Sequence, residues 1–254
     1  MNADKEKEFL IKRIYDLADT SLSRQTYTYT NFLSPLEQDY FLSCSSDFSS
    51  VGCQLWGGAS SCLRKLIIFG SEDNIGYPLP SPIRILHIAP KAAKFAEELS
   101  HRDYLGSLMA LGIDRGLTGD IIIRDHQAWV YVLDSVVSFI TENLTSVRHT
   151  AVLCTEVEGE IPELEIKFQT ISANLASERL DLILGAITGQ KREQAKSLLA
   201  DQKVFVNGRL AENSGKSLKA GDEITVRGFG KFIYDGISSE SRKGRLNITI
   251  RKYV

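Results

Sequence analysis

The stretch from residue 177 to residue 234 decides the fold of this 254-residue chain. It reads SERLDLILGAITGQKREQAKSLLADQKVFVNGRLAENSGKSLKAGDEITVRGFGKFIY. Apolar residues recur here at the i, i+3, i+4, i+7 spacing of a short amphipathic helix, namely Leu180, Ile183, Leu184 and Ile187. A glycine comes directly after this pattern and is expected to end the helix.

A second helix and a hairpin are expected to follow the first helix. The second helix begins at about Glu193, and two short strands come after it at 204–206 and 224–226. Asn207-Gly208 supplies the residue pair that tight hairpin turns favour, because both positions require a positive φ. The stretch therefore predicts a small unit of two helices and a sheet.

Cationic side chains gather at the helix starts and turns of this unit. Long Lys and Arg side chains in such places can reach a phosphate backbone. At the start of the second helix, Arg192 and the helix N-terminus are expected to address the same phosphate. The expected RNA-binding residues are Arg179, Lys191, Arg192, Lys196, Lys203, Asn207, Arg209, Lys216, Lys219, Arg227 and Lys231.

The charge of the chain is divided unevenly. Residues 178–254 hold 15 Lys and Arg against 9 Asp and Glu, a net charge of +6. The whole chain holds 30 Lys and Arg and 32 Asp and Glu. Residues 1–177 therefore hold 15 Lys and Arg and 23 Asp and Glu, a net charge of −8. Such asymmetry between halves indicates contact with nucleic acid. The alternative is an ordinary solvated surface.

The length of the chain suggests two or three domains of α+β class. We expect an N-terminal α+β domain at 1–81 and a ferredoxin-like βαββαβ domain at 82–160, an arrangement that RNA-recognition modules also use. A connector at 161–176 would lead into the basic unit at 177–254. A fragment that begins near Ser177 is expected to bind RNA by itself.

Two sets of residues in the middle domain invite a functional interpretation. Trp129 and Tyr131 share one face of an expected strand, where they could stack bases or cover a neighbouring element. The triplet His101-Arg102-Asp103 resembles a kinase catalytic loop. Such a loop needs an Asn five residues past the Asp, where this chain has Leu. We therefore expect Arg102 and Asp103 to begin or cap a helix.

Neither a membrane span nor a metal site is expected. No apolar run approaches the ~20 residues that a membrane span requires, and the first residues, MNADKEKEF, lack the apolar core of a signal peptide. We expect the protein to stay in the cytoplasm. The four cysteines form no Cys-x-x-Cys pair, so the sequence indicates no zinc site, no disulfide framework and no cofactor.

The basic unit resembles the S4 RNA-binding domain, which is named after the fourth small-subunit ribosomal protein. The resemblance is carried by RLD at 179–181, Arg192 followed by Ala195, VFVNG at 204–208 and GDEITVRG at 221–228. Two positions depart from the pattern of that family. Lys191 stands where Ser is usual, and Gln202 stands where Gly is usual.

The chain as a whole resembles the YlmH-type proteins, bacterial proteins in which two small N-terminal domains of α/β-sandwich type precede an S4 domain. This resemblance is carried by HRDYLGSLMALGIDRGLTGDI at 101–121, FLSPLE at 32–37, Gly57-Gly58 and RGFGKF at 227–232. It implies association with the large ribosomal subunit and with tRNA during quality control of nascent chains.

We therefore expect a non-catalytic protein that binds rRNA, tRNA or both by phosphate and shape, with no membrane and no small-molecule substrate. One alternative is an RNA-modifying enzyme with an appended S4 domain, such as a pseudouridine synthase. Arg102-Asp103 and Gly119-Asp120 are its candidate residues, and no base or phosphate cradle accompanies either pair. Another alternative is a cell-division adaptor that binds protein through the acidic half.

Overall fold

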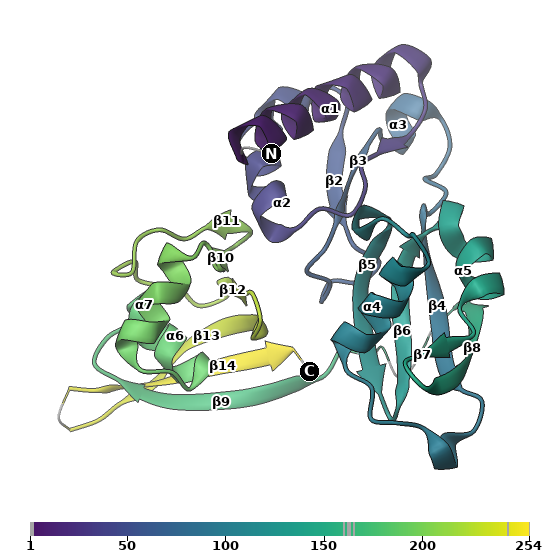
Figure 1. Ribbon diagram of the computed structural model, residues 1–254. Coiled ribbons are helices and arrows are strands. Elements are labelled where there is room, and N and C mark those ends of the chain that lie inside the picture. The colour runs from purple at the N-terminus through teal and green to yellow at the C-terminus, as the bar shows by residue number, and fades with distance from the viewer. Residues whose placement is uncertain (1–2, 160, 162–163, 165, 243, 254) are drawn as a thin grey trace. The chain divides into compact units, whose positions relative to one another are not determined.

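The computed structural model of the chain describes residues 3–159, 161, 164, 166–242 and 244–253 (Figure 1). It divides into two compact units. The first unit comprises 1–37 and 43–165, and the second comprises 38–42 and 166–254. Among the described residues, no helix combines the length and the apolar character needed to cross a membrane.

The N-terminal part of the first unit is a small sheet with a long helix. The sheet has the strand order β1-β3-β2, with antiparallel pairing throughout. All four residues of the central strand β3 are buried, and the long helix α1 buries Ile14, Leu17 and Ala18. The elements are α1 (Ala3–Arg24), β1 (Thr28–Tyr29), β2 (Cys53–Trp56), β3 (Leu66–Phe69) and α3 (Glu72–Ile75). Helix α2 (Pro35–Leu42) begins in this unit, and its residues 38–42 belong to the second unit.

The second part of the first unit has the expected ferredoxin-like topology. Its five-stranded antiparallel sheet has the order β5-β6-β4-β8-β7. Asp125 and His126 take positive φ values of 48° and 64° and form the tight turn between β5 and β6. The elements are β4 (Ile83–Pro90), α4 (His101–Ala110), β5 (Thr118–Arg124), β6 (Gln127–Leu133), α5 (Val137–Asn143), β7 (Ser146–Val147) and β8 (Thr150–Val157).

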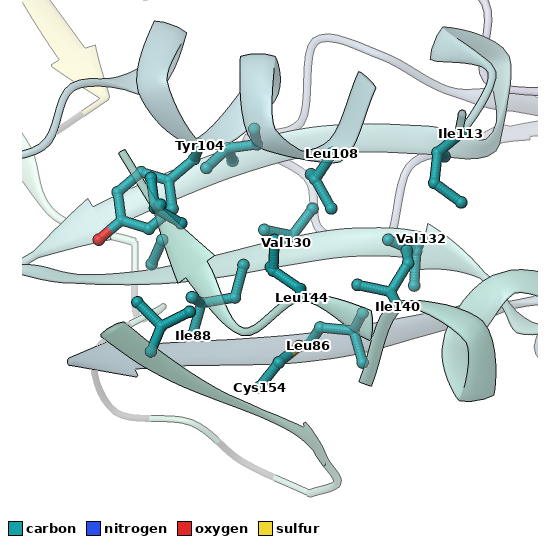
Figure 2. Packing of buried hydrophobic residues seen from close by; sticks show 14 of the residues in the cluster. Leu86, Ile88, Tyr104, Leu108, Ile113, Val130, Val132, Ile140, Leu144 and Cys154 are labelled. Atoms are coloured by element: carbon teal, nitrogen blue, oxygen red, sulfur yellow. The ribbon is translucent and has the colours of Figure 1, made fainter. Parts of the chain in front are cut away.

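The helices α4 and α5 contribute to one core with this sheet, as Figure 2 shows. The sheet side of that core consists of alternate residues of its central strands, because successive side chains of a strand point to opposite faces. Strand and helix residues in this core include Leu86, Ile88, Val130, Val132, Leu108 and Ile140.

A second core lies on the opposite side of β6 and joins the two parts of the first unit. Tyr131 and Leu133 pack there with Phe32 and Leu66 of the N-terminal part. Tyr131 is only 2% exposed. A Cβ at Gly58 would lie 2.3 Å from the Tyr131 ring, which explains the need for glycine in the Gly57-Gly58 pair.

These contacts decide between the two interpretations of the aromatic pair on β6. Tyr131 belongs to the core between the two parts, so its ring faces are occupied by the chain itself. Trp129 is 4% exposed and stacks on His87 of β4 with ring centroids 4.8 Å apart. The two rings are therefore packing residues, and the structure does not support base stacking by this pair.

Arg64 also ties the two parts of the first unit together. Its guanidinium group donates hydrogen bonds to the backbone carbonyls of Phe32 at 2.5 Å, Arg115 at 3.3 Å and Thr118 at 3.2 Å. Charged donors bind buried carbonyls strongly because little water competes for them. Arg64 therefore joins its own loop to two segments that are distant in the sequence, one at Phe32 and one at residues 115–118.

The second unit is a six-stranded antiparallel sheet whose core includes α6 and α7. Its strand order is β11-β10-β12-β13-β14-β9. The core of this unit contains the four apolar residues that predicted the first helix, together with Val204, Ile224, Phe232 and Ile250 from the sheet. The elements are β9 (Phe168–Leu175), α6 (Leu180–Thr188), α7 (Arg192–Ala200), β10 (Val204–Val206), β11 (Arg209–Leu210), β12 (Glu223–Val226), β13 (Gly230–Glu240) and β14 (Leu246–Tyr253).

Strand β9 lies in the stretch that the sequence suggests as a connector, of which residues 162–163 and 165 are outside the described part. It pairs with β14 over its whole length, from Phe168 opposite Tyr253 to Leu175 opposite Leu246. Its alternate residues Ile171, Ala173 and Leu175 pack against the core of the second unit. The strand is thus an integral part of this sheet.

We predict that a fragment of residues 166–254 is more stable than one of residues 177–254. The shorter fragment lacks β9, which leaves the edge of β14 unpaired and exposes apolar side chains of the core. Urea unfolding followed by circular dichroism should give the shorter fragment a lower midpoint. Equal midpoints would mean that β9 contributes nothing to the second unit.

Candidate nucleic-acid interface

The organising residue of the basic unit is Asp181, in the first turn of α6. Its side chain is 0% exposed, and it accepts hydrogen bonds from two arginines. Arg179 binds both carboxylate oxygens at 3.2 Å, through Nε and Nη2. Arg192 binds Oδ2 through Nε at 2.9 Å and through Nη2 at 2.8 Å. We call these three residues the Asp181 triad.

The triad holds two cations in fixed positions at the surface. Burial raises the pKa of Asp181, but the hydrogen bonds and charges of the two arginines outweigh burial, so this pKa lies below its ordinary value. The hydrogen bond to Asp181 also raises the pKa of Arg179. The side chains of Arg179 and Arg192 remain 41% and 54% exposed. One carboxylate therefore orients two guanidinium groups, and the triad keeps a net charge of +1.

A distant loop completes this region at the start of α6. The backbone N–H of Leu180 donates to the carbonyl of Lys216 at 2.8 Å, and the N–H of Asp181 donates to that of Ser214 at 3.0 Å. These bonds satisfy N–H groups that a helix start leaves unpaired. They also bring Lys216, whose side chain is exposed, next to the start of α6, where the following residue Ser217 forms a β-bridge with Arg179.

Helix α7 contributes the other cations of this region. Lys191 and Lys196 are exposed, and Lys196 lies one turn beyond Arg192 on the same helix face. The backbone N–H of Lys191 donates to the side chain of Gln194 at 3.3 Å, which caps the helix start. We define the cationic face as Arg179, Lys191, Arg192, Lys196 and Lys216.

The remaining predicted residues do not belong to this face. Lys203 pairs with Asp201 at 2.8 Å. Lys219 and Arg227 are exposed on turns, and Arg209 lies on the edge strand β11.

Two of the predicted residues have other tasks in the fold. The side chain of Lys231 is 8% exposed, and its ammonium pairs with Glu223 at 3.0 Å, so the structure does not support contact with a phosphate. Asn207 takes a φ of 52° in the β10–β11 turn and binds Asp222 and the backbone of Glu223. Its side chain is therefore used in holding the turn.

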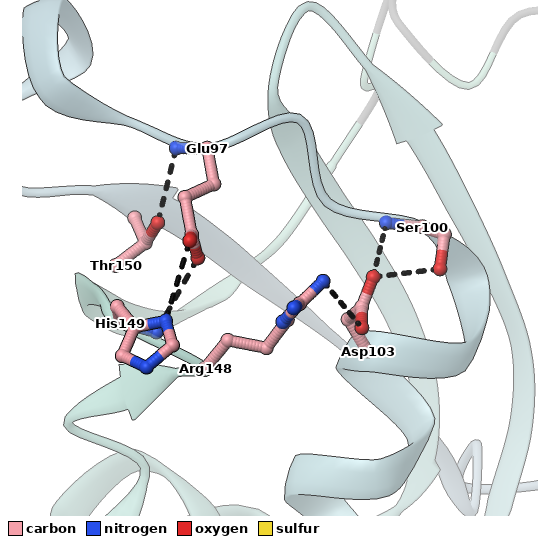
Figure 3. A network of polar contacts seen from close by, with 6 residues as sticks. All are labelled: Glu97, Ser100, Asp103, Arg148, His149 and Thr150. Atoms are coloured by element: carbon pink, nitrogen blue, oxygen red, sulfur yellow. Dashed lines mark hydrogen bonds and ion pairs between the residues drawn. The ribbon is translucent and has the colours of Figure 1, made fainter.

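The candidate residues of the enzyme alternative also have structural tasks. Asp103 lies in the first turn of α4, and its Oδ2 accepts hydrogen bonds from the hydroxyl of the N-cap residue Ser100 at 2.7 Å and from the backbone N–H of Ser100 at 2.8 Å (Figure 3). The bond from the hydroxyl is the main reason that the pKa of Asp103 is lowered. Asp120 is held by the backbone N–H of Leu63, and burial raises its pKa. The helix-cap interpretation of Asp103 is thus confirmed.

Metal binding receives no support from the described residues, which contain no group of three or more His, Cys, Asp or Glu side chains suited to an ion.

Sequence reasoning identified the arginines but missed what holds them. Periodicity places Arg192 on the polar side of its helix, which suggests that it can be replaced freely. In the structure it compensates a buried carboxylate eleven residues earlier. The available signal was the Asp within the RLD motif, since a buried Asp next to an apolar helix face requires a cationic partner.

Two helices on an antiparallel sheet, with exposed cations at the helix starts, fit the architecture expected of an S4-type RNA-binding domain. The family model "S4 domain" matches residues 178–224, and the model "Putative RNA-binding domain in YlmH" matches residues 82–160. The chain therefore carries a YlmH-type RNA-binding domain in its first unit and an S4 domain in its C-terminal unit.

Two known proteins are similar to this chain over most of their own length. "Ribosome-associated protein quality control protein P2" of Bacillus subtilis (strain 168) is 27% identical over 228 residues, which cover 88% of this chain and 86% of that protein. The solved structure of the "Cell division protein ylmH from Streptococcus pneumoniae" is 19% identical with a TM-score of 0.47, and the similarity covers 60% of this chain and 92% of that one.

We predict that Asp181→Asn lowers the free energy of unfolding by about 1–3 kcal/mol, because charged hydrogen bonds are lost in the core while the half-exposed arginines stay hydrated. The pKa of folded Asp181 lies below the usual 3.8, so the carboxylate stabilises the fold above about pH 4. This contribution is lost as pH falls through the folded pKa. The variant should therefore lose less stability on acidification.

Urea unfolding at several pH values measures both effects. Asp201→Asn is the matched control, since the side chain of Asp201 is 53% exposed and pairs with the half-exposed Lys203 at the surface. If the two variants had equal stability and equal pH dependence, the triad would have no structural role.

Proposed function

We propose that the cationic face binds the sugar-phosphate backbone of structured RNA. The observation that most strongly supports this proposal is the Asp181 triad, in which one buried carboxylate holds two guanidinium groups at the surface. A planar guanidinium offers paired donors that match two phosphate oxygens. Groups that are already oriented lose little conformational entropy when they bind.

Recognition on this face uses phosphate and shape more than base stacking. The stretch from residue 180 to residue 200, which forms both helices and the turn between them, contains no Phe, Tyr or Trp. Stacking on aromatic rings is the usual way in which single-stranded RNA is bound. A face made of oriented cations suits the backbone of a folded RNA, with modest preference for sequence.

The proposed setting is the ribosome. The Bacillus subtilis relative is named a ribosome-associated quality control protein, and its similarity extends over both units of this chain. We infer that this chain acts without catalysis on the large ribosomal subunit in the cytoplasm, where it contacts rRNA, tRNA or both during nascent-chain quality control. Asp103 and Asp120, the candidates for a catalytic role, are engaged by the fold.

The double variant Lys196→Ala/Lys216→Ala should weaken binding to unrelated duplex RNAs by a similar factor. It should also reduce the slope of log K against log salt concentration by about one to two units, since each phosphate contact releases ~0.7–0.9 of a counterion. Both side chains are exposed, and no described residue pairs with either ammonium, so circular dichroism should show an intact fold. Binding isotherms across a salt series measure the slope.

Lys5→Ala/Lys12→Ala is the matched control, because it removes two exposed charges from α1 in the other unit. This control should leave the slope unchanged. A folded Lys196/Lys216 variant with the affinity and slope of the unaltered protein would show that the cationic face is only a solvated surface.

Sedimentation with purified ribosomal subunits tests the proposed setting. The unaltered protein should pellet with the large subunit and not with the small one, and the Lys196→Ala/Lys216→Ala variant should remain in the supernatant at moderate salt. Equal pelleting with both subunits would contradict a specific place on the large subunit.

A further inference from the structure

A hollow of about 360 Å³ opens beside the cationic face, between the end of α7 and the chain that follows β11. Its lining residues are Lys196, Leu199, Ala200, Gln202, Glu212 and Ser214. One of these, Lys196, also belongs to the cationic face. A ligand in the hollow would thus lie next to any phosphate that this face holds.

The backbone at Gln202 is unusual. Its φ is 54°, in the left-handed region that favours glycine, and its N–H donates to the carbonyl of Leu199 at 3.0 Å as α7 ends. A side chain other than that of glycine is disfavoured in this conformation. The strained position nevertheless carries a long amide side chain that lines the hollow. Backbone strain that a fold retains is often found at binding sites.

The polar side chains of the hollow are available to a ligand. Lys196 and Glu212 carry opposite charges and line the same hollow, yet they form no ion pair within 4.0 Å. Within the described part of the chain, the side chains of Gln202 and Ser214 have no hydrogen-bond partner either. The hydrogen-bond donors and acceptors of these side chains are therefore free to bind a ligand.

The chemistry of these groups matches a guanine base. The Glu212 carboxylate can only accept, and the N1–H and N2–H groups of guanine donate side by side. The Lys196 ammonium can only donate, and O6 of guanine accepts. Leu199 and Ala200 offer apolar contact to the flat face of the base. No other RNA base presents two adjacent donors beside an acceptor on one edge.

We propose that this hollow receives one unstacked guanine of the RNA that the cationic face binds. The inference rests on the proposed function, because the phosphates next to that guanine are those held by the cationic face. It adds a base-specific contact to binding that otherwise follows phosphate and shape. Unpaired nucleotides in loops and bulges are the places where proteins read RNA bases.

The test uses the full chain and RNA hairpins that share one stem and differ in a single bulged nucleotide, G, A, C or U. A fully paired hairpin is the reference. The unaltered protein should bind the G hairpin about tenfold more tightly than the U hairpin, as one good bidentate contact provides. In Gln202→Gly and in Glu212→Gln this ratio should fall below about twofold.

The two variants separate loss of the base contact from loss of the fold. Gln202→Gly relieves a strained backbone, so it should be at least as stable as the unaltered chain in urea. Glu193→Gln is the control for Glu212→Gln, because it removes an exposed carboxylate from α7 outside the hollow. This control should keep the tenfold ratio.

Equal affinity of the unaltered protein for all four bulged hairpins would overturn the proposal, as would a ratio that survives in both hollow variants. The fully paired hairpin reports on the proposed function separately. If it binds with the expected salt dependence while the bulged base makes no difference, only the guanine site is refuted. If it does not bind, the cationic face itself is refuted.

Discussion

The second unit depends on a carboxylate that its own fold has removed from water. Asp181 lies in the first turn of a helix whose neighbouring residues form the core. An ionised carboxylate in such a place is very costly unless cations and hydrogen bonds compensate it. Arg179 and Arg192 provide both. The requirement for compensation fixes where these arginines lie, and the outer parts of their side chains remain exposed. In the proposed function, stability and RNA binding are thus coupled through the same three residues.

The first unit has the ferredoxin-like topology of RNA-recognition modules, but the aromatic side chains Trp129 and Tyr131 of its sheet are packed within the fold. Its ferredoxin-like sheet has one face covered by α4 and α5, and around Tyr131 the other face packs against the N-terminal part. The close approach at Gly58 and the three hydrogen bonds of Arg64 tighten that contact. Modules with this topology that read single-stranded RNA need exposed aromatic rings on the sheet. In this chain the corresponding rings stabilise the fold.

The sequence predicts those features that depend on neighbouring residues. Helical periodicity identifies α6, the Asn207-Gly208 pair identifies the hairpin turn, and the position of Asp103 identifies a helix cap. Each of these follows from local spacing or from the φ that a turn requires.

Features that depend on distant pairing could not be predicted in this way. Strand β9 joins the sheet through β14, whose residues come more than 70 positions later in the chain. Lys231 lies on β13 opposite Thr225 of β12, and its buried side chain pairs with the half-exposed Glu223 of the same strand, so a candidate phosphate ligand is engaged within the sheet. The role of Arg192 becomes visible only when α6 and α7 are packed together.

The most direct test of the central claim is nuclear magnetic resonance of the arginine Nε–H groups in the full chain. If Asp181 binds both arginines, the Nε–H protons of Arg179 and Arg192 should exchange slowly with water, unlike that of the exposed Arg227. Both signals should shift when duplex RNA is added. Fast exchange of both protons, or signals that RNA leaves unchanged, would contradict the account.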